Sequence, residues 1–180
     1  QARKVAEQGA FNALQAMAVN HPEPYAHMDA TDRSQRNSLR SKARLLGDAL
    51  QANGAQEINQ LSYELAYETW HKMLFAKFLE ANQLLMHPDG VAVTMEDCEE
   101  LGKEEGYADK WDAAANYASR MLPAIFRVDD PLMKVAYATN DRIKLEGIIE
   151  GLENAIFTAD DALGWVYQFW QSEAKAAINA

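Results

Sequence analysis

Four arginines form the most conspicuous group of side chains with binding chemistry in this chain. Arg33, Arg36, Arg40 and Arg44 are spaced three, four and four residues apart, so on a helix they share one face. Guanidinium groups bind phosphate oxygens and carboxylates through several donors at once. This arginine stripe therefore predicts contact with a DNA backbone or with an acidic partner. The alternative is a solvated helix face whose charges pair with the protein's own carboxylates.

A second candidate surface lies near the end of the chain, in the aromatic sequence GWVYQFWQ of residues 164–171. Val166, Tyr167 and Trp170 recur at helical spacing and form one apolar stripe. Trp165 and Phe169 lie one turn apart on roughly the opposite side. A helix that is apolar on both sides is usually covered on both sides. Trp165 and Phe169 are thus candidates for docking another domain, and the alternative is that both faces pack within this one.

The sequence contains no recognisable motif for a metal site, a reactive cysteine or a bound cofactor. The histidines lie on different segments without ligand spacing, and Cys98 is the only cysteine. Its acidic neighbours Asp97, Glu99 and Glu100 raise the pKa expected for the thiol, which disfavours a reactive thiolate. No glycine-rich turn follows a strand, so neither a phosphate loop nor a cofactor loop is expected. We predict no catalytic, cofactor-binding or metal-binding residues in this segment.

Composition narrows the class of protein further. With 180 residues and 48% hydrophobic content, the chain is expected to form one folded domain over residues 1–180. The formal net charge of −10 opposes non-specific binding to nucleic acid or to an anionic membrane. No stretch has the length of a membrane span or the pattern of a signal peptide. We expect a cytoplasmic protein with no membrane partner, and the first residue, Gln1, suggests a piece of a longer chain.

Helical patterns run through most of the sequence. The first expected helix extends to about residue 19, and an irregular connection follows over residues 20–32. A second helix should carry Leu39, Ala43, Leu46 and Leu50 on one face and end near Gly54. A long third helix should begin near residue 58 and end before the His87-Pro88-Asp89-Gly90 turn.

Shorter helices are predicted in the second half. Thr94 and Asp97 have the spacing of a capping box, so a short acidic helix should start there and stop by Gly106. Pro123 should shorten the next helix, and Asp130-Pro131 has the pattern of a helix start. Further helices are expected over about residues 143–152 and from about residue 160. The fold class is all-α, an irregular bundle of about six to eight helices without a substantial sheet, with five large side chains in its core: Trp70, Phe78, Trp111, Leu122 and Trp170.

Three segments carry a resemblance to a known family. They are YETWHKMLFAKFLEAN (residues 67–82), LMHPDG (residues 85–90) and DDALGWVYQFW (residues 160–170). In this order they resemble segments in the helical N-terminal domain of large adenine-specific DNA methyltransferases of bacterial phage-defence and restriction-modification systems. The resemblance covers roughly residues 60–175.

The resemblance implies a parent enzyme that uses S-adenosylmethionine to methylate adenine N6 in double-stranded DNA. This segment would be its non-catalytic N-terminal module, which packs on the catalytic domain and contacts the DNA backbone through the arginine stripe. The family's glycine-rich cofactor loop and its Asn-Pro-Pro-aromatic loop have no counterpart here, so no catalytic residue is carried over. The alternative is a protein-interaction or regulatory domain that recruits another component of a defence system.

Overall fold

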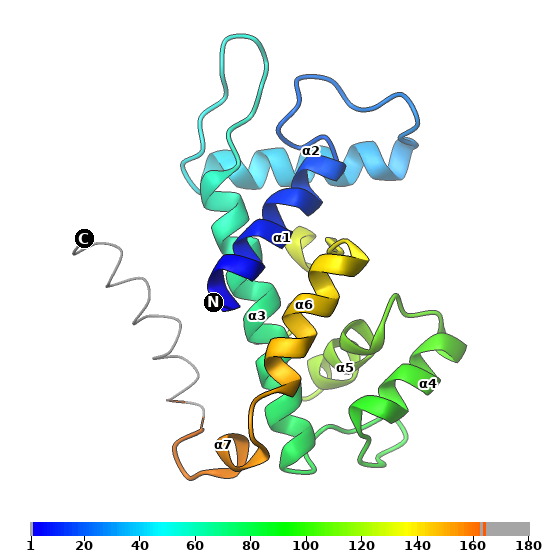
Figure 1. Ribbon diagram of the computed structural model, residues 1–180. Coiled ribbons are helices and arrows are strands. Elements are labelled where there is room, and N and C mark those ends of the chain that lie inside the picture. Colours follow the sequence, from blue (N-terminus) through cyan, green and yellow to red (C-terminus); the bar gives the residue numbers. More distant parts are fainter. Residues whose placement is uncertain (1, 163, 165–180) are drawn as a thin grey trace, which may run out of the picture. The chain divides into compact units, whose positions relative to one another are not determined.

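The structure is a computed structural model that describes residues 2–162 and residue 164 (Figure 1). Within these residues it is all-helical, with seven α-helices, one 3₁₀ helix and no strand. The predicted fold class is therefore confirmed. The helices are α1 (Ala2–Ala16), α2 (Ala30–Leu45), α3 (Asn59–Ala81), α4 (Met95–Glu105), α5 (Lys110–Ser119), η1 (Pro131–Lys134), α6 (Thr139–Glu150) and α7 (Asn154–Thr158).

The described residues form two compact units. The first unit contains the residues up to Trp70 together with Asp129–Glu146, and the second contains His71–Val128 together with the residues from Gly147 onward. The boundaries fall inside α3 and α6, so each of these helices contributes one part to each unit. Charge is divided unevenly between them. The first unit has ten basic and twelve acidic residues, whereas the second has seven basic and fifteen acidic residues.

In the first unit, the start of α3 is capped by a carboxylate that lies outside the helix. Asp48 is buried, and its two oxygens accept the backbone N–H groups of Gln60 and Leu61, each at 2.9 Å. These N–H groups have no partner within their own helix, and a negative charge is favourable at a helix N-terminus. The buried Gln56 side chain donates to the carbonyls of Asp48 and Ala49 at 3.2 Å, which fixes the loop that presents the cap.

A glycine allows α1 to approach the segment before α6 in the same unit. The hydroxyl of Tyr137 donates to the carbonyl oxygen of Ala6 at 2.8 Å. At Gly9, one turn further along α1, a Cβ atom would lie 2.6 Å from the Tyr137 ring. Asn12 extends the contact by donating to the carboxylate of Asp141 at 2.9 Å. This face of α1 therefore depends on the absence of a side chain at residue 9.

In the second unit, α4 forms where its sequence predicts it. Thr94 and Asp97 make a reciprocal capping box, and Gly106 ends the helix in a left-handed conformation with φ of +83°. Helices α4 and α5 pack closely, since a Cβ atom at Gly102 would lie 3.0 Å from the Cβ of Ala113. The last residue of α5 is Ser119, which confirms that the helix ends ahead of Pro123.

The end of the second helix differs from our prediction. Helix α2 ends at Leu45, and Gly47 has a φ of +103°, so the chain leaves the helical path there and not near Gly54. Leu39 and Ala43 are buried as expected. Beyond the helix end, the shared face no longer exists, and Leu46 and Leu50 are 36% and 53% exposed.

The predicted core is confirmed in part. Trp70 and Trp111 are buried, each 3% exposed. Phe78 and Leu122 are only half-buried, and the fully buried aromatic side chains nearby are Tyr117 and Phe126 instead. Trp170 lies outside the described residues.

Candidate functional site

The four arginines of the stripe all lie on α2, but they do not share one environment. Arg36 and Arg40 are buried, 4% and 9% exposed, whereas Arg33 and Arg44 are exposed. The difference follows from the long connection between α1 and α2, which arches over the second helix and covers part of its face (Figure 1). Helical spacing alone places the four side chains in line, but it does not tell which of them this connection covers.

Arg36 binds carbonyl oxygens of that connection. Its Nε donates to Ala18 at 2.8 Å, and its Nη2 donates to His21 and, at 3.0 Å, to Pro22. Its Nη1 donates to the side-chain oxygen of Asn37 at 3.3 Å. Burial lowers the pKa of Arg36, and the nearby charge of Glu23 opposes that shift. All its donor nitrogens are engaged within the first unit.

Arg40 completes the same arrangement one turn later. Its Nη1 donates to Val19 at 2.8 Å and to His21 at 2.7 Å, while its Nη2 reaches Gly54 at 2.7 Å. Burial lowers its pKa, and the positive charges of Arg36 and Arg44 add to that effect. We call these contacts of Arg36 and Arg40 the arginine clasp. Both side chains are buried and most of their donors are used inside the protein, so in this conformation they are not presented to a DNA backbone.

Arg33 and Arg44 stay available on the surface. The Nε of Arg33 donates to the carbonyl of Met28 at 3.0 Å. Arg44 donates to the side-chain oxygens of Gln56 at 3.2 Å and of Ser41 at 3.0 Å. Both guanidinium groups remain exposed at opposite ends of α2, so contact with phosphate remains a prediction for these two residues alone.

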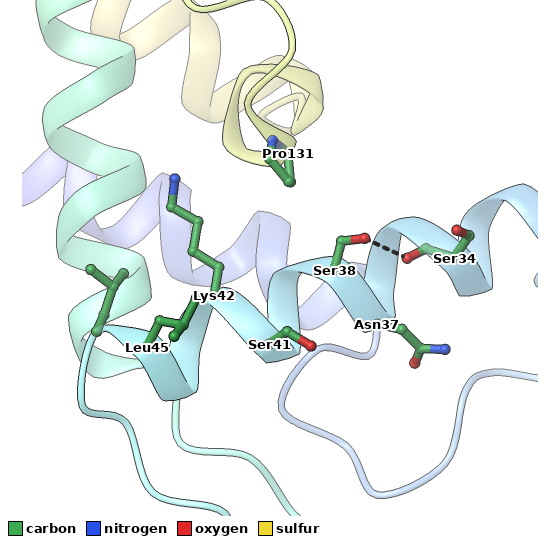
Figure 2. Close-up of a pocket in the computed structure, with 8 residues that line it drawn as sticks. Ser34, Asn37, Ser38, Ser41, Lys42, Leu45 and Pro131 are labelled. Carbon is green, nitrogen blue, oxygen red and sulfur yellow. Dashed lines mark hydrogen bonds between the residues drawn. The ribbon is translucent and has the colours of Figure 1, made fainter.

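One side of α2 borders a shallow, open groove of about 700 Å³ against η1 (Figure 2). Figure 2 shows Lys42 extending from α2 toward the η1 segment, where its ammonium group pairs with both carboxylate oxygens of Asp130. Leu45 is 87% exposed at the end of the helix. Asp130 offsets the charge of Lys42, and the exposed surface of the groove is mostly apolar. Its lining consists of Ser34, Asn37, Ser38, Ser41, Lys42, Leu45, Leu46 and Pro131.

A cluster in the second unit was not predicted from the sequence. The Nε2 of His87 lies 2.9 Å from one carboxylate oxygen of Glu105, and the Tyr117 hydroxyl donates to the other oxygen at 2.9 Å. The rings of His87 and Tyr117 meet edge to face at 5.1 Å. The residues come from a turn, the end of α4 and α5, so no local pattern could reveal the cluster. The sequence predicts a turn at His87, but it does not indicate the partners of this side chain.

The electrostatics of this cluster favour a structural role over a reactive one. Hydrogen bonds from His87 and Tyr117 lower the pKa of Glu105. Burial raises the pKa of Tyr117, and the adjacent Glu105 carboxylate adds to the increase. A carboxylate that stays charged and a phenol that stays protonated hold each other in place, and neither is suited to accept a proton near neutral pH.

Cys98 agrees with the prediction of an unreactive thiol. The side chain is fully buried, and burial raises its pKa to about 12, with smaller contributions from Asp97, Glu80 and Glu105. The sequence identified the acidic neighbours, but burial is the larger cause. Among the described residues, no group of three or more side chains is arranged to hold a metal ion.

The two predicted docking residues, Trp165 and Phe169, lie outside the described residues. Over residues 2–162 and residue 164, no helix is both long enough and apolar enough to cross a bilayer. No protein-family model, curated protein or solved structure matches this chain.

Proposed function

We propose that this chain is a non-catalytic helical module of an adenine-specific DNA methyltransferase that uses S-adenosylmethionine. In this proposal, the module packs on the catalytic domain and contacts the DNA backbone through Arg33 and Arg44. The family follows from the resemblance in residues 67–82, 85–90 and 160–170. S-adenosylmethionine and double-stranded DNA are bound by the parent enzyme, and this chain helps to position the DNA.

The groove beside α2 is the observation that best supports docking of the catalytic domain on this chain. A charged ligand would need an unpaired charge there, but Lys42 is neutralised by Asp130. The exposed leucine at position 45 and the small side chains of the wall instead fit an apolar protein surface with complementary shape. We assign this groove to the catalytic domain of the same protein.

The docking role is tested with the catalytic domain expressed separately and added to this chain. Leu45→Asp should abolish co-elution of the two, because the substitution places a charge on the apolar contact. Ile143→Asp is the matched control, since Ile143 is an exposed apolar residue of the first unit on α6, 55% exposed. Equal loss in both variants, or in neither, would contradict the assignment of the groove.

The DNA role is tested by salt-dependent binding of the full-length protein to a duplex. Each phosphate contact contributes about 0.9 to the slope of log affinity against log salt concentration. The double variant Arg33→Ala/Arg44→Ala should flatten this slope by about two units. Sequence preference should survive, because phosphate contacts do not read bases. An unchanged slope would show that these arginines do not touch DNA.

A second function is favoured by the charge of the second unit. Helix α4 exposes Glu96, Asp97, Glu99, Glu100 and Glu104 in a unit with fifteen acidic and seven basic residues. Such a surface fits a basic protein partner, as expected for a domain that recruits another component of a defence system. Binding of that component to the chain without the catalytic domain, lost in the variant Glu96→Lys/Glu100→Lys, would favour this alternative.

A further inference from the structure

The connection between α1 and α2 carries a row of exposed rings. The ring centroids of His21 and Tyr25 lie 5.9 Å apart, and those of Tyr25 and His27 lie 5.8 Å apart with an interplanar angle of 22°. All three side chains are exposed, and Tyr25 is the one exposed large aromatic side chain among the residues that the structure describes. We call these three residues the ring row. These rings are therefore not part of the core, and their side chains are accessible from solvent.

The ring row is held in place by its backbone. The arginine clasp binds the carbonyls of residues 18, 19, 21 and 22, and the Tyr25 hydroxyl donates to the carbonyl of Gln15 at 3.1 Å. Met28, one residue beyond His27, is buried. The row is thus ordered before any ligand arrives, which removes part of the entropic cost of binding.

Two polar side chains of α2 are connected by hydrogen bonds to the segment that carries the row. Arg33 donates through its Nε to Met28, and its two terminal nitrogens make no further hydrogen bond among those found in the structure. The side-chain oxygen of Asn37 accepts a hydrogen bond from Arg36, whose guanidinium also donates to the carbonyls of His21 and Pro22. Figure 2 shows the amide of Asn37 on the side of α2 away from Pro131. A guanidinium and an amide adjacent to stacked rings are suited to phosphate oxygens.

The local charge also favours an anionic ligand. Residues 20–44 contain five basic and three acidic residues, within a chain of net charge −10. Among the acidic residues, Glu23 lies near the buried guanidiniums of Arg36 and Arg40, and Asp29 caps α2 by accepting the N–H of Asp32 at 2.8 Å. The segment therefore has a net positive charge within an acidic protein, and the rings lie within it.

We infer that the ring row and Arg33 form a binding site for an unpaired stretch of DNA. Bases in a duplex present only their edges, whereas unpaired bases present the faces that stack on aromatic and imidazole rings. Tyr25 and His27 supply those rings, and Arg33 with Asn37 binds the adjoining phosphates. The inference rests on the proposed DNA contact of Arg33 and extends it from the duplex backbone to a single strand at the N-terminal end of α2.

The test is fluorescence anisotropy of the 180-residue chain with labelled oligothymidylate and with a duplex of equal length at low salt. The chain should bind the single strand at least tenfold more tightly. Tyr25→Ala should weaken this binding about tenfold or more, as expected for the loss of one stacking platform. Tyr25→Phe should retain it, because the ring remains and only the hydroxyl contact to Gln15 is lost. Melting curves confirm that both variants fold.

Ile143→Ala is the matched control, since Ile143 is an exposed apolar residue of the same unit and belongs to neither proposed site. Equal affinity of the chain for strand and duplex, or no effect of Tyr25→Ala beyond that of Ile143→Ala, would overturn the inference. Absence of binding to the single strand would also overturn it. None of these results bears on the docking of the catalytic domain or on the salt slope with duplex DNA, so the two proposals fail separately.

Discussion

At the scale of single residues, the arginine clasp shows how a guanidinium can serve the main chain alone. Arg36 and Arg40 bind five backbone carbonyls between them, those of residues 18, 19, 21, 22 and 54. Among the residues that the structure describes, no carboxylate accepts a hydrogen bond from either side chain, although Glu23 is close enough to affect both pKa values. Buried carbonyls without a donor are costly, so the clasp stabilises a connection that has no regular secondary structure.

The clasp gives a prediction for stability. Arg40→Ala should lower the free energy of unfolding by about 2–3 kcal/mol, because it leaves buried carbonyls without charged donors. Arg40→Lys should recover little of this loss, since one ammonium group cannot reach both Val19 and Gly54 in the geometry of a guanidinium. Urea denaturation of these variants tests the prediction. Arg33→Ala is the control, with one carbonyl contact and an exposed side chain, and an equal effect of Arg33 and Arg40 would contradict the role of the clasp.

The same residues show which features the sequence predicts and which depend on contacts between distant residues. Spacing correctly placed the four arginines on one helix, and capping chemistry correctly bounded α4, since both depend on residues within a few positions. Burial of Arg36 and Arg40 depends on carbonyls that lie 14 to 21 residues away in the chain, most of them earlier, and no local pattern contains them. The cluster of His87, Glu105 and Tyr117 could not be predicted for the same reason. Glu105 lies 18 residues after His87 and 12 residues before Tyr117.

At the scale of elements, two helical glycines have opposite expected effects. Alanine normally stabilises a helix relative to glycine by about 1 kcal/mol. At Gly147 in α6, no atom of the described residues outside the adjoining backbone lies within 4 Å of an added Cβ, so Gly147→Ala should stabilise the protein. At Gly9 in α1 the added Cβ would lie 2.6 Å from the Tyr137 ring, so Gly9→Ala should destabilise it.

Thermal melting of the two glycine variants provides the measurement. The melting temperature should rise for Gly147→Ala and fall for Gly9→Ala. The double variant Gly9→Ala/Tyr137→Ala should recover part of the loss from the clash while still lacking the hydroxyl contact to Ala6. A rise in melting temperature for Gly9→Ala would mean that α1 does not approach Tyr137 as closely as the structure shows.

The contact of Glu105 with His87 and Tyr117 joins the turn at residue 87 to α4 and α5, and it predicts a pH dependence. The folded protein holds the pKa of Glu105 below its ordinary value of 4.5. The stabilisation is therefore complete above the unfolded value and is lost as pH falls through the lower folded value. Glu105→Gln should be less stable than wild type at pH 7, and this difference should shrink below about pH 4.5. A difference that stays constant from pH 7 to pH 3 would show that the ionised carboxylate is unimportant.

At the scale of the whole molecule, charge is the property that distinguishes the two units. The second unit has eight more acidic than basic residues, and the first has only two more. Like charges within one unit repel one another and destabilise the folded state, and salt screens that repulsion. A chain with this distribution should respond to ionic strength mainly through its second unit.

Helix α4 gives a direct test of that repulsion. Glu100 is exposed, and Glu96 and Glu104 lie four residues to either side of it. Each such pair of like charges costs about 0.2–0.5 kcal/mol on a helix, so Glu100→Lys should stabilise the protein by up to about 1 kcal/mol at low salt. The gain should decrease as sodium chloride rises from about 10 mM to 1 M. A gain that is independent of salt would point to helix propensity and not to charge.

The arginine clasp also has a consequence for how the connection between α1 and α2 can change. Its donors bind main-chain oxygens, and these are present whatever side chain a position carries. Side chains within the loop contribute to its shape mainly through the contacts of His21 with Glu23 and of Tyr25 with Gln15. A library randomised at residues 23 and 27 should therefore keep its fold while its surface varies, as expected for a recognition loop on a fixed scaffold.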